Sequence, residues 1–155
     1  MKKWIFLPFV ILLFSCSNEN KIVDQMIDIP KSEWTYDQIP DYPFQVENTN
    51  IYHDFYIKLR VSKSYKYENL YLLSHIHEPN GKIKNQTINL TLTDSTGKPL
   101  GQSTGSAIDY EFPMGKMSFK EVGQYKIALE QNMRDSMVNG IESIGVRIMK
   151  GEPVF

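Results

Sequence analysis

The two residues best spaced for chemistry in this sequence are His75 and His77. They lie two apart in a segment with the composition of a strand, so both side chains are expected to leave the same face. Two imidazoles on one face could begin a zinc or copper site, with Glu78 or His53 as a third ligand. We favour the plainer interpretation of a solvated strand face, because nothing in the sequence specifies the remaining ligands. We therefore expect no metal and no other cofactor.

Other catalytic arrangements are weaker still. A serine nucleophile needs a tight elbow, and Ser106, which follows Gly105, has no second glycine at the required offset. Asp109 and Glu111 share an expected strand face and could form a glycosidase pair, but acidic pairs of this kind are common on solvated surfaces. The nine glycines contain no phosphate-binding loop and no dinucleotide fingerprint. The sequence therefore indicates a protein that is not an enzyme.

Aromatic residues crowd the first half of the chain: Trp34, Tyr36, Tyr42, Tyr52, Tyr56, Tyr65, Tyr67 and Tyr71. Such rings can stack on sugars or lie in protein interfaces, whereas ordinary sheet packing also favours tyrosine. Tyr56 alternates with the core positions of its strand, so we expect it outside the buried face. Trp34, beside a proline-rich loop, is either a core residue or an interface residue. Arg134 and Arg147 are interface candidates whose alternative roles are a helix end and a strand surface.

The N-terminus has the anatomy of an export signal. Lys2 and Lys3 precede an unbroken apolar run from Trp4 to Phe14. As a helix, this run would span roughly 16 Å, and the hydrocarbon core of a bilayer is about 30 Å thick. The run is therefore too short to serve as a membrane anchor.

The residues Leu13-Phe14-Ser15-Cys16 resemble a bacterial lipobox and contain the only cysteine of the chain. In lipoproteins of this kind the cysteine sulfur receives a diacylglycerol, and the signal is cut before the cysteine. The new amino terminus is then acylated, for which we expect palmitate. Each buried methylene contributes about 0.8 kcal/mol, and two or more acyl chains bind a membrane stably. A secreted protein with a stray cysteine at its signal boundary is the alternative.

Length and charge set further limits. Residues 1–15 are expected to form the signal peptide, 16–21 a lipidated tether and 22–155 one domain. The chain carries 17 basic and 18 acidic residues without a basic block, which argues against a nucleic-acid partner. No motif indicates a small-molecule ligand. Once Cys16 is acylated, no thiol remains for a disulfide, so the hydrophobic core alone must hold the fold.

The elements that follow read as short strands. The clearest signal is His53–Val61, in which every second residue is apolar, the period of a half-buried antiparallel strand. The expected strands cover 22–29, 44–47, 53–61, 69–78, 87–94, 116–121, 124–131 and 145–150. Residues 132–140 are the single helical candidate. We expect an all-β fold, an Ig-like or jelly-roll-like antiparallel two-sheet β-sandwich with one short helix near the C-terminus, after an N-terminal signal helix.

Several segments carry a family resemblance in a fixed order. They are Phe55–Arg60, Tyr67–Leu72, Leu92–Asp94 with Gly97, Gly123–Ile127, Gln131–Arg134, Gly140-Ile141 and Ile144–Ile148. Together with the lipobox, they resemble the GldH family of gliding-motility lipoproteins from bacteria related to Flavobacterium. The resemblance implies a cell-envelope component that is needed for gliding and is associated with type IX secretion. It carries over no catalytic residue, and the only position it transfers is the lipidated Cys16.

Two hypotheses follow. The leading one is an outer-membrane lipoprotein held by the lipid on Cys16, facing the periplasm or the exterior, that docks other proteins of the gliding and secretion machinery. It depends on the lipobox, the missing catalytic set and the C-terminal segments of the resemblance. The alternative is a carbohydrate-binding module on an envelope lipoprotein, in which exposed tyrosines such as Tyr56 stack on sugar rings.

Overall fold

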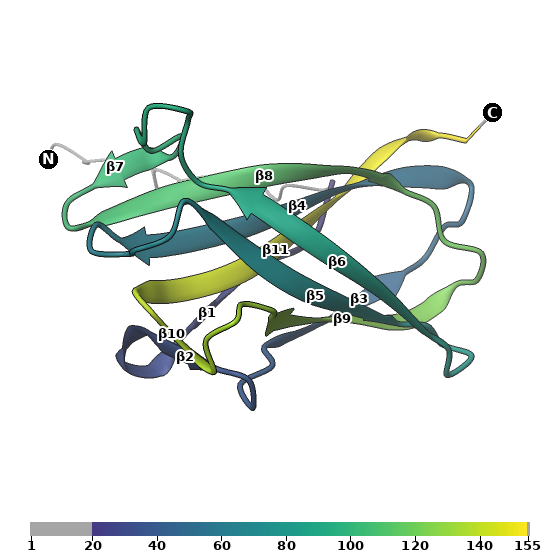
Figure 1. Cartoon of the computed structure of the whole chain (residues 1–155). Helices are drawn as coiled ribbons and strands as arrows, with labels where there is room; N and C mark the ends of the chain where they lie inside the picture. Colours follow the sequence, from purple (N-terminus) through teal and green to yellow (C-terminus); the bar gives the residue numbers. More distant parts are fainter. Residues whose placement is uncertain (1–19, 155) are drawn as a thin grey trace, which may run out of the picture.

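The computed structural model describes residues 20–154, and nearly all regular structure in that part is β-strand (Figure 1). Two antiparallel sheets pack face to face, with strand orders β1-β11-β4-β8-β7 and β3-β9-β5-β6. A short ribbon of β10 and β2 lies beside them. The strands are β1 (Lys21–Asp28), β2 (Glu33–Thr35), β3 (Asp41–Val46), β4 (Ile51–Ser62), β5 (Asn69–His77), β6 (Ile83–Thr91), β7 (Gln102–Thr104), β8 (Ala107–Met117), β9 (Gly123–Gln131), β10 (Met137–Asn139) and β11 (Ile141–Pro153), and a 3₁₀ turn, η1 (Pro30–Ser32), follows β1. The all-β, antiparallel part of the prediction is confirmed.

The core forms because the apolar alternation of β4 meets matching rows on its neighbours. Leu59, Ile57 and Phe55 stand opposite Ile144, Val146 and Ile148 of β11, and all six side chains are buried. The facing row from the second sheet includes Leu70, Leu72, Ile127 and Leu129, each fully buried. Burying one such side chain contributes about 1.5–3 kcal/mol. The alternation expected over His53–Val61 therefore sets the inner face of the first sheet.

Tyr42 of β3 ties the two sheets together. Its ring is fully buried, and its hydroxyl donates a hydrogen bond to the backbone oxygen of Ile144 in β11 at 2.7 Å. Burial, with a smaller contribution from the nearby Asp41 carboxylate, raises the pKa of the Tyr42 hydroxyl well above its ordinary value. The hydroxyl is therefore a fixed donor between the layers.

The helix expected over residues 132–140 is absent, and this prediction is wrong. The chain makes bends after β9 and then forms the strand β10. The side-chain amide of the buried Gln131 donates to the backbone oxygen of Asp135 at 3.1 Å, and its carbonyl accepts from the N–H of Met133 at 2.9 Å. These bonds satisfy backbone groups that a helix would pair internally. The expected signal helix lies outside the described residues.

The strand expected over 116–121 is displaced. Strand β8 covers 107–117, and a loop follows it. Pro113 and Gly115 broke the strand pattern, and they lie where the register with β4 shifts by one residue. Gly115 has a φ of +96°, which suits a bulge. The bulge explains why the sequence pattern did not predict β8 as one long strand.

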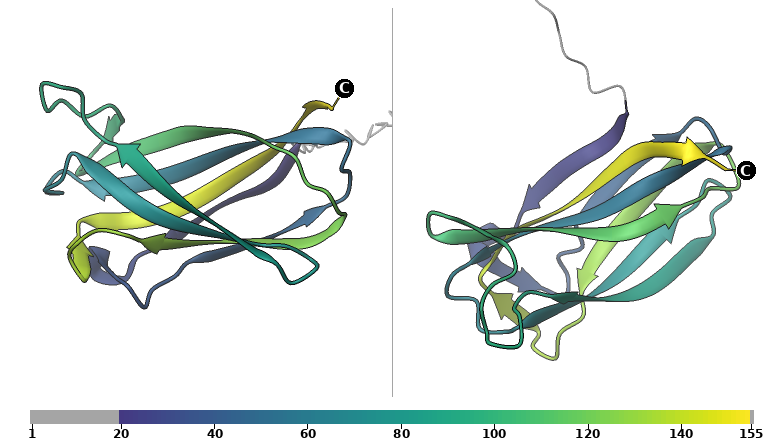
Figure 2. Two further views of the ribbon diagram at one scale, coloured as in Figure 1. Left: turned by 45° about the vertical axis from the view of Figure 1, so that its right-hand side comes forward. Right: turned by 90° about the horizontal axis from the view of Figure 1, so that it is seen from above.

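The sandwich has two ends (Figure 2). At the end termed proximal, the chain enters at Asn20, whose backbone oxygen accepts from the N–H of Lys150 at 2.7 Å. The tip of the β5–β6 hairpin lies at the same end, where Pro79 approaches Gly123 closely. Gly123 pairs with Val46 at the end of β3, and the next residue, Glu47, pairs with Lys150. The end termed distal holds the β2–β10 ribbon and the loops 63–68 and 132–136. Within residues 20–154, no helix is long and apolar enough to cross a bilayer.

Candidate functional site

The outer face of the first sheet carries a lattice of paired charges, some on adjacent strands and some separated by one intervening strand. Lys58 Nζ lies 2.8 Å from the Asp24 carboxylate, and Lys21 lies 3.0 Å from the same group. The Arg60 guanidinium meets the Asp109 carboxylate, with Nε 2.9 Å from Oδ1. Lys58 thus reaches Asp24 across β11, Lys21 pairs with Asp24 within β1, and Arg60 pairs with Asp109 on the adjacent β8, so each of these charges has an opposite charge on the same face.

Two of the predicted interface residues, Tyr56 and Arg147, meet on this face. They are cross-strand neighbours of β4 and β11, and the Arg147 guanidinium lies 4.5 Å from the centre of the Tyr56 ring. Arg147 also forms an ion pair with Glu111 of β8. One face of the Tyr56 ring is thus covered by a cation. This contact weakens the sugar-stacking hypothesis, which requires an open ring face at Tyr56.

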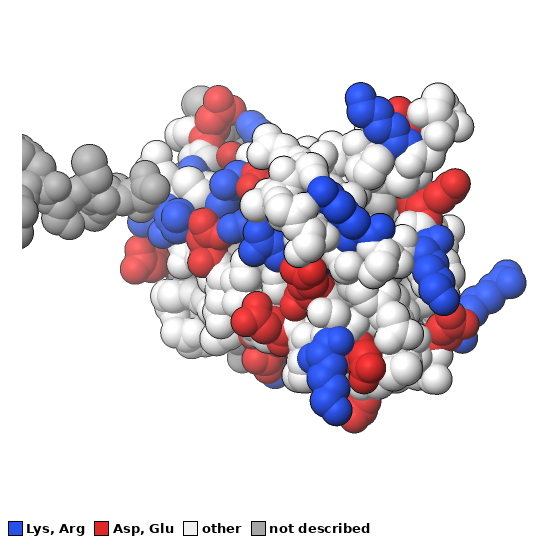
Figure 3. Space-filling model, turned by 90° about the vertical axis from the view of Figure 1, so that its left-hand side faces the viewer, with Lys and Arg blue, Asp and Glu red and all other residues white. Residues whose placement is uncertain are grey.

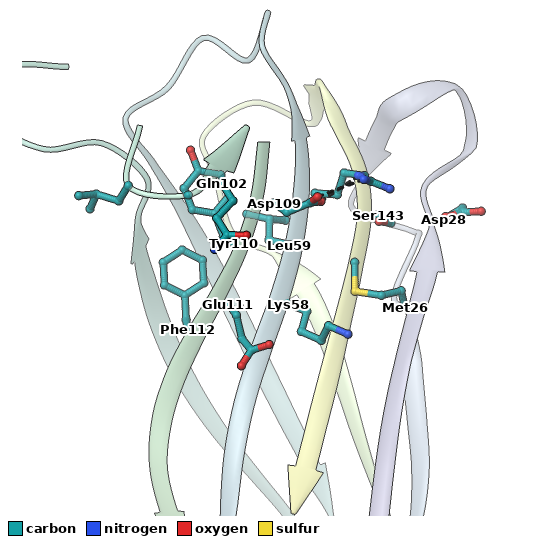
Figure 4. Close-up of a pocket in the computed structure, with 13 residues that line it drawn as sticks. Met26, Asp28, Lys58, Leu59, Gln102, Asp109, Tyr110, Glu111, Phe112 and Ser143 are labelled. Carbon is teal, nitrogen blue, oxygen red and sulfur yellow. Dashed lines mark hydrogen bonds and ion pairs between the residues drawn. The ribbon is translucent and has the colours of Figure 1, made fainter. Parts of the chain in front are cut away.

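A shallow groove of about 900 Å³ crosses the same face (Figure 4). It is lined by side chains from β1, β4, β8 and β11, including Met26, Lys58, Asp109 and Glu111. Asp109 and Glu111, considered above as a carboxylate pair, each contact an arginine. The groove thus has a polar floor in which Lys58, Asp109 and Glu111 already have charged partners.

The histidines do not gather into one site. His75 has both ring nitrogens engaged, Nδ1 at 2.9 Å from Asn85 Oδ1 and Nε2 at 3.1 Å from Glu130 Oε2. His53 lies in the core, 1% exposed, and Glu78 pairs with a lysine of its own hairpin. In the part of the chain that the structure describes, no group of three or more His, Cys, Asp or Glu side chains could hold a metal ion.

The distal end carries a second surface, the tyrosine–methionine patch, formed by Tyr36, Tyr71, Met133 and Met137. Tyr36, Tyr71 and Met137 are each 41% exposed, and Met133 is partly buried and contacts both Tyr36 and Tyr71. The Tyr36 hydroxyl donates to the Met133 backbone oxygen at 2.7 Å, and the Tyr71 N–H points to the Met133 sulfur at 3.3 Å. Met137 pairs with Thr35, which precedes Tyr36. Three separate segments of the chain therefore converge on this patch.

The loop that presents Met133 is held in place by the chain beneath it. The N–H of Asn132 donates to the backbone oxygen of Tyr71 at 2.8 Å, and Gln131 supplies the bonds described above. Arg134, another predicted interface residue, is exposed in this loop. Figure 3 looks toward this end, where Lys and Arg alternate with Asp and Glu and no field of a single sign forms.

Trp34 lies beneath the distal end, in the core. It is fully buried, and its indole N–H donates to the backbone oxygen of Gln38 at 2.7 Å. It pairs with Val138 across the β2–β10 ribbon. Of the two alternatives left open for Trp34, the structure supports the core role. Sequence reasoning missed Met137 and the buried Gln131, because both had been placed in or next to an expected helix.

The comparisons with known proteins agree with this organisation. The sequence profile of the family described as GldH lipoprotein matches residues 21–148, from the first residue of β1 into β11. The chain belongs to the GldH lipoprotein family. It is 29% identical over 153 residues to the "Gliding motility lipoprotein GldH homolog" of Christiangramia forsetii, and the match covers 93% of both chains. It is 26% identical over 155 residues to the "Gliding motility lipoprotein GldH" of Flavobacterium johnsoniae, again over 93% of both chains. The family match spans both sheets, and the resemblance expected from the sequence is confirmed.

Proposed function

We propose that this GldH-family chain is an outer-membrane lipoprotein that serves gliding motility by docking other envelope proteins, among them components of the type IX secretion apparatus. It acts without catalysing a reaction. The names of its relatives support the link to gliding. The lipobox at Cys16 supports the anchor.

The position of the tyrosine–methionine patch is the observation that carries the docking proposal. Four residues separate Cys16 from Lys21. A fully extended chain covers about 3.3–3.6 Å per residue, so Lys21 lies within ~18 Å of an anchored Cys16. The short tether keeps the proximal end near the lipid surface. The patch, at the opposite end, faces away from that membrane and is accessible to proteins.

The chemistry of the patch also favours a protein partner. Tyr, Met and Arg are enriched in the cores of protein interfaces, and methionine adapts its shape to a facing surface. The loop that carries Met133 and Arg134 is already hydrogen-bonded to Gln131 and Tyr71. A surface ordered before binding loses less conformational entropy when a partner arrives.

The test is the variant Cys16→Ala in the native host. We expect a folded domain that leaves the membrane fraction for the soluble fraction, with loss of gliding. Fractionation and colony spreading measure the two effects, and thermal melting of the released protein controls for folding. A Cys16→Ala chain that still sediments with membranes would refute the lipid anchor. A released chain that still supports gliding would refute anchored docking.

A further inference from the structure

The two open sheets end in β1, β7, β3 and β6, and residues 110–117 of β8 form a further edge because β7 pairs only with residues 107–109. Pro113 and the bulge beside Gly115 interrupt that part of β8, and three of the four outermost strands are also protected against further pairing. Edge strands expose unpaired N–H and C=O groups, and proteins block them with short length, proline, bulges or charges. Strand β7 has only three residues, and β3 contains Pro43. Strand β1 has a register irregularity near Lys21 and carries Asp24 and Asp28.

Strand β6 has neither short length, proline nor a bulge, and it carries a single charge. It has nine residues, without proline or glycine, and pairs with β5 without a register shift. Its only charge, Lys84, lies 2.5 Å from Glu78 at the tip of the same hairpin. Seven of its nine residues are exposed, and only Ile88 and Leu90 are buried. As the outermost strand of the second sheet, β6 presents a long and regular edge (Figure 1).

The hydrogen-bond pattern identifies which backbone groups face outward. At one end of the hairpin, the N–H of Glu78 donates to the oxygen of Lys82, and at the other the N–H of Leu92 donates to the oxygen of Glu68, both at 2.8 Å. In an antiparallel ladder, hydrogen-bonded and non-hydrogen-bonded pairs alternate. The even-numbered residues of β6 therefore bond to β5. The odd-numbered residues, Ile83, Asn85, Thr87, Asn89 and Thr91, direct their N–H and C=O groups away from the sheet, and no strand within residues 20–154 pairs with them.

We infer that β6 accepts an extended segment of a partner protein as an added strand of the second sheet. The inference rests on the proposed docking function and assigns it a second contact besides the tyrosine–methionine patch. Alternating donors and acceptors at strand spacing are satisfied as a set by another extended backbone. The partner is therefore a polypeptide segment in the β conformation.

The tether argues that this segment comes from a different protein and not from a second copy of this chain. Strand β6 runs from the proximal end, at Ile83, toward the distal end. Two copies of β6 paired antiparallel would point their proximal ends in opposite directions. Both copies, however, hold Lys21, at the proximal end, within ~18 Å of a Cys16 anchored in the same membrane. A separate protein is free of this restriction.

The side chains of β6 indicate the composition of the added strand. On the outer face it would lie beside Asn85, Thr87 and Asn89, which suits Ser, Thr or Asn. On the inner face it would lie beside Ile88 and Leu90, which suits Val or Ile. The segment thus alternates polar and β-branched apolar residues over about five to seven positions, the usual length of a strand.

Thr87→Pro tests the inference, with Thr87→Val as the matched control. Proline removes an N–H that faces solvent and leaves the ladder with β5 intact, whereas valine keeps the N–H and the branched shape. A photo-crosslinking residue replaces the exposed Thr91 in the full-length lipoprotein in living cells, and mass spectrometry maps the crosslinked peptide. We expect a crosslink to an alternating segment of another protein that persists in Thr87→Val and is lost, together with gliding, in Thr87→Pro.

Membrane fractionation and thermal melting accompany every variant. If Thr87→Pro melts early, Asn89→Pro replaces it, because its N–H also faces outward. A Thr87→Pro chain that keeps both the crosslink and gliding would overturn the strand-addition inference. So would a crosslink to a second copy of this chain. Either result leaves the anchor test at Cys16 unaffected, so failure of this inference is distinguishable from failure of the proposed function.

Discussion

The outer face of the first sheet and the surfaces around the second sheet use their polar groups in opposite ways. On the first, Lys58, Arg60 and Arg147 each meet a carboxylate of another strand of the same sheet. Around the second, the outward backbone groups of β6 and the Tyr and Met side chains of the distal patch have few or no partners within the described residues. The polar groups of the first face thus interact with one another, whereas those around the second sheet are free to interact with a partner.

Residues that attract attention in the sequence and the structure are therefore not the same as residues that are free to bind a partner. The first sheet holds the groove of about 900 Å³ and several ion pairs, which could suggest a binding site. A new ligand there would compete with existing surface ion pairs, each worth about 0.2–1 kcal/mol, and would gain little by replacing them. A partner at the patch or at β6 would displace water. We therefore expect a partner to bind where polar groups lack partners within the described residues.

The largest expected effect comes from breaking the patch. The double variant Tyr36→Ala with Met137→Asp removes one aromatic anchor and places a charge on the apolar surface. We expect a loss of about 2 kcal/mol or more in partner binding, which is roughly 30-fold, and a loss of gliding. Crosslinked-partner yield in cells and colony spreading are the measurements.

The matched control for the patch is Lys58→Ala on the first sheet. It truncates a partly exposed, ion-paired side chain of the lattice and should leave partner yield and spreading unchanged. If Lys58→Ala impaired spreading as strongly as the patch variant, while both remained folded in the membrane, the contrast between the two surfaces would be wrong.

A smaller effect is expected for Gln131→Leu, which keeps the buried volume but removes the amide. The N–H of Met133 and the backbone oxygen of Asp135 would lose their partners. Leaving such groups unsatisfied costs about 1–3 kcal/mol, less where water reaches them. Thermal unfolding measures the loss, and hydrogen exchange should show faster exchange at Met133 in particular. Unchanged exchange there would show that Gln131 does not order the patch.

The sequence predicted what depends on local periodicity. The alternation of Phe55, Ile57, Leu59 and Val61 alone defines the inner face of β4, because strand geometry sends every second side chain to one side. The same rule put Tyr56 on the outer face, where the structure places it. Turn residues such as Pro79-Asn80-Gly81 marked the hairpin that ends at β6 for a similarly local reason.

What escaped prediction depends on contacts between distant segments. Tyr56 and Arg147 are 91 positions apart and meet only because β4 pairs with β11 in one register. Tyr36, Tyr71 and Met137 belong to three segments, so no window of sequence contains the patch. The polar stretch after Gln131 has the local composition of a helix or a turn, and the hydrogen bonds of the buried Gln131 side-chain amide favour the turn. Likewise, the bulge at Gly115 interrupts the pattern that would have indicated β8.

The smallest effect is expected at Asp24, which joins two lysines in the charge lattice. Partial burial pushes the pKa of its carboxyl upward, but the hydrogen bonds and charges of Lys58 and Lys21 outweigh that, and the pKa lies below its ordinary value. A lowered pKa gives stability that is present above the ordinary pKa of an aspartate, about 3.9, and is lost as the pH falls through the value in the folded state. Surface ion pairs contribute only about 0.2–1 kcal/mol, so Asp24→Asn should lower the free energy of unfolding by that amount at pH 7 and by little at pH 2. Urea unfolding of both proteins across this pH range measures the difference. An equal loss of unfolding free energy at both pH values would mean that Asp24 stabilises the face through packing and not through charge. The contrast between the ion-paired lattice and the patch would then be weaker than the ion pairs suggest.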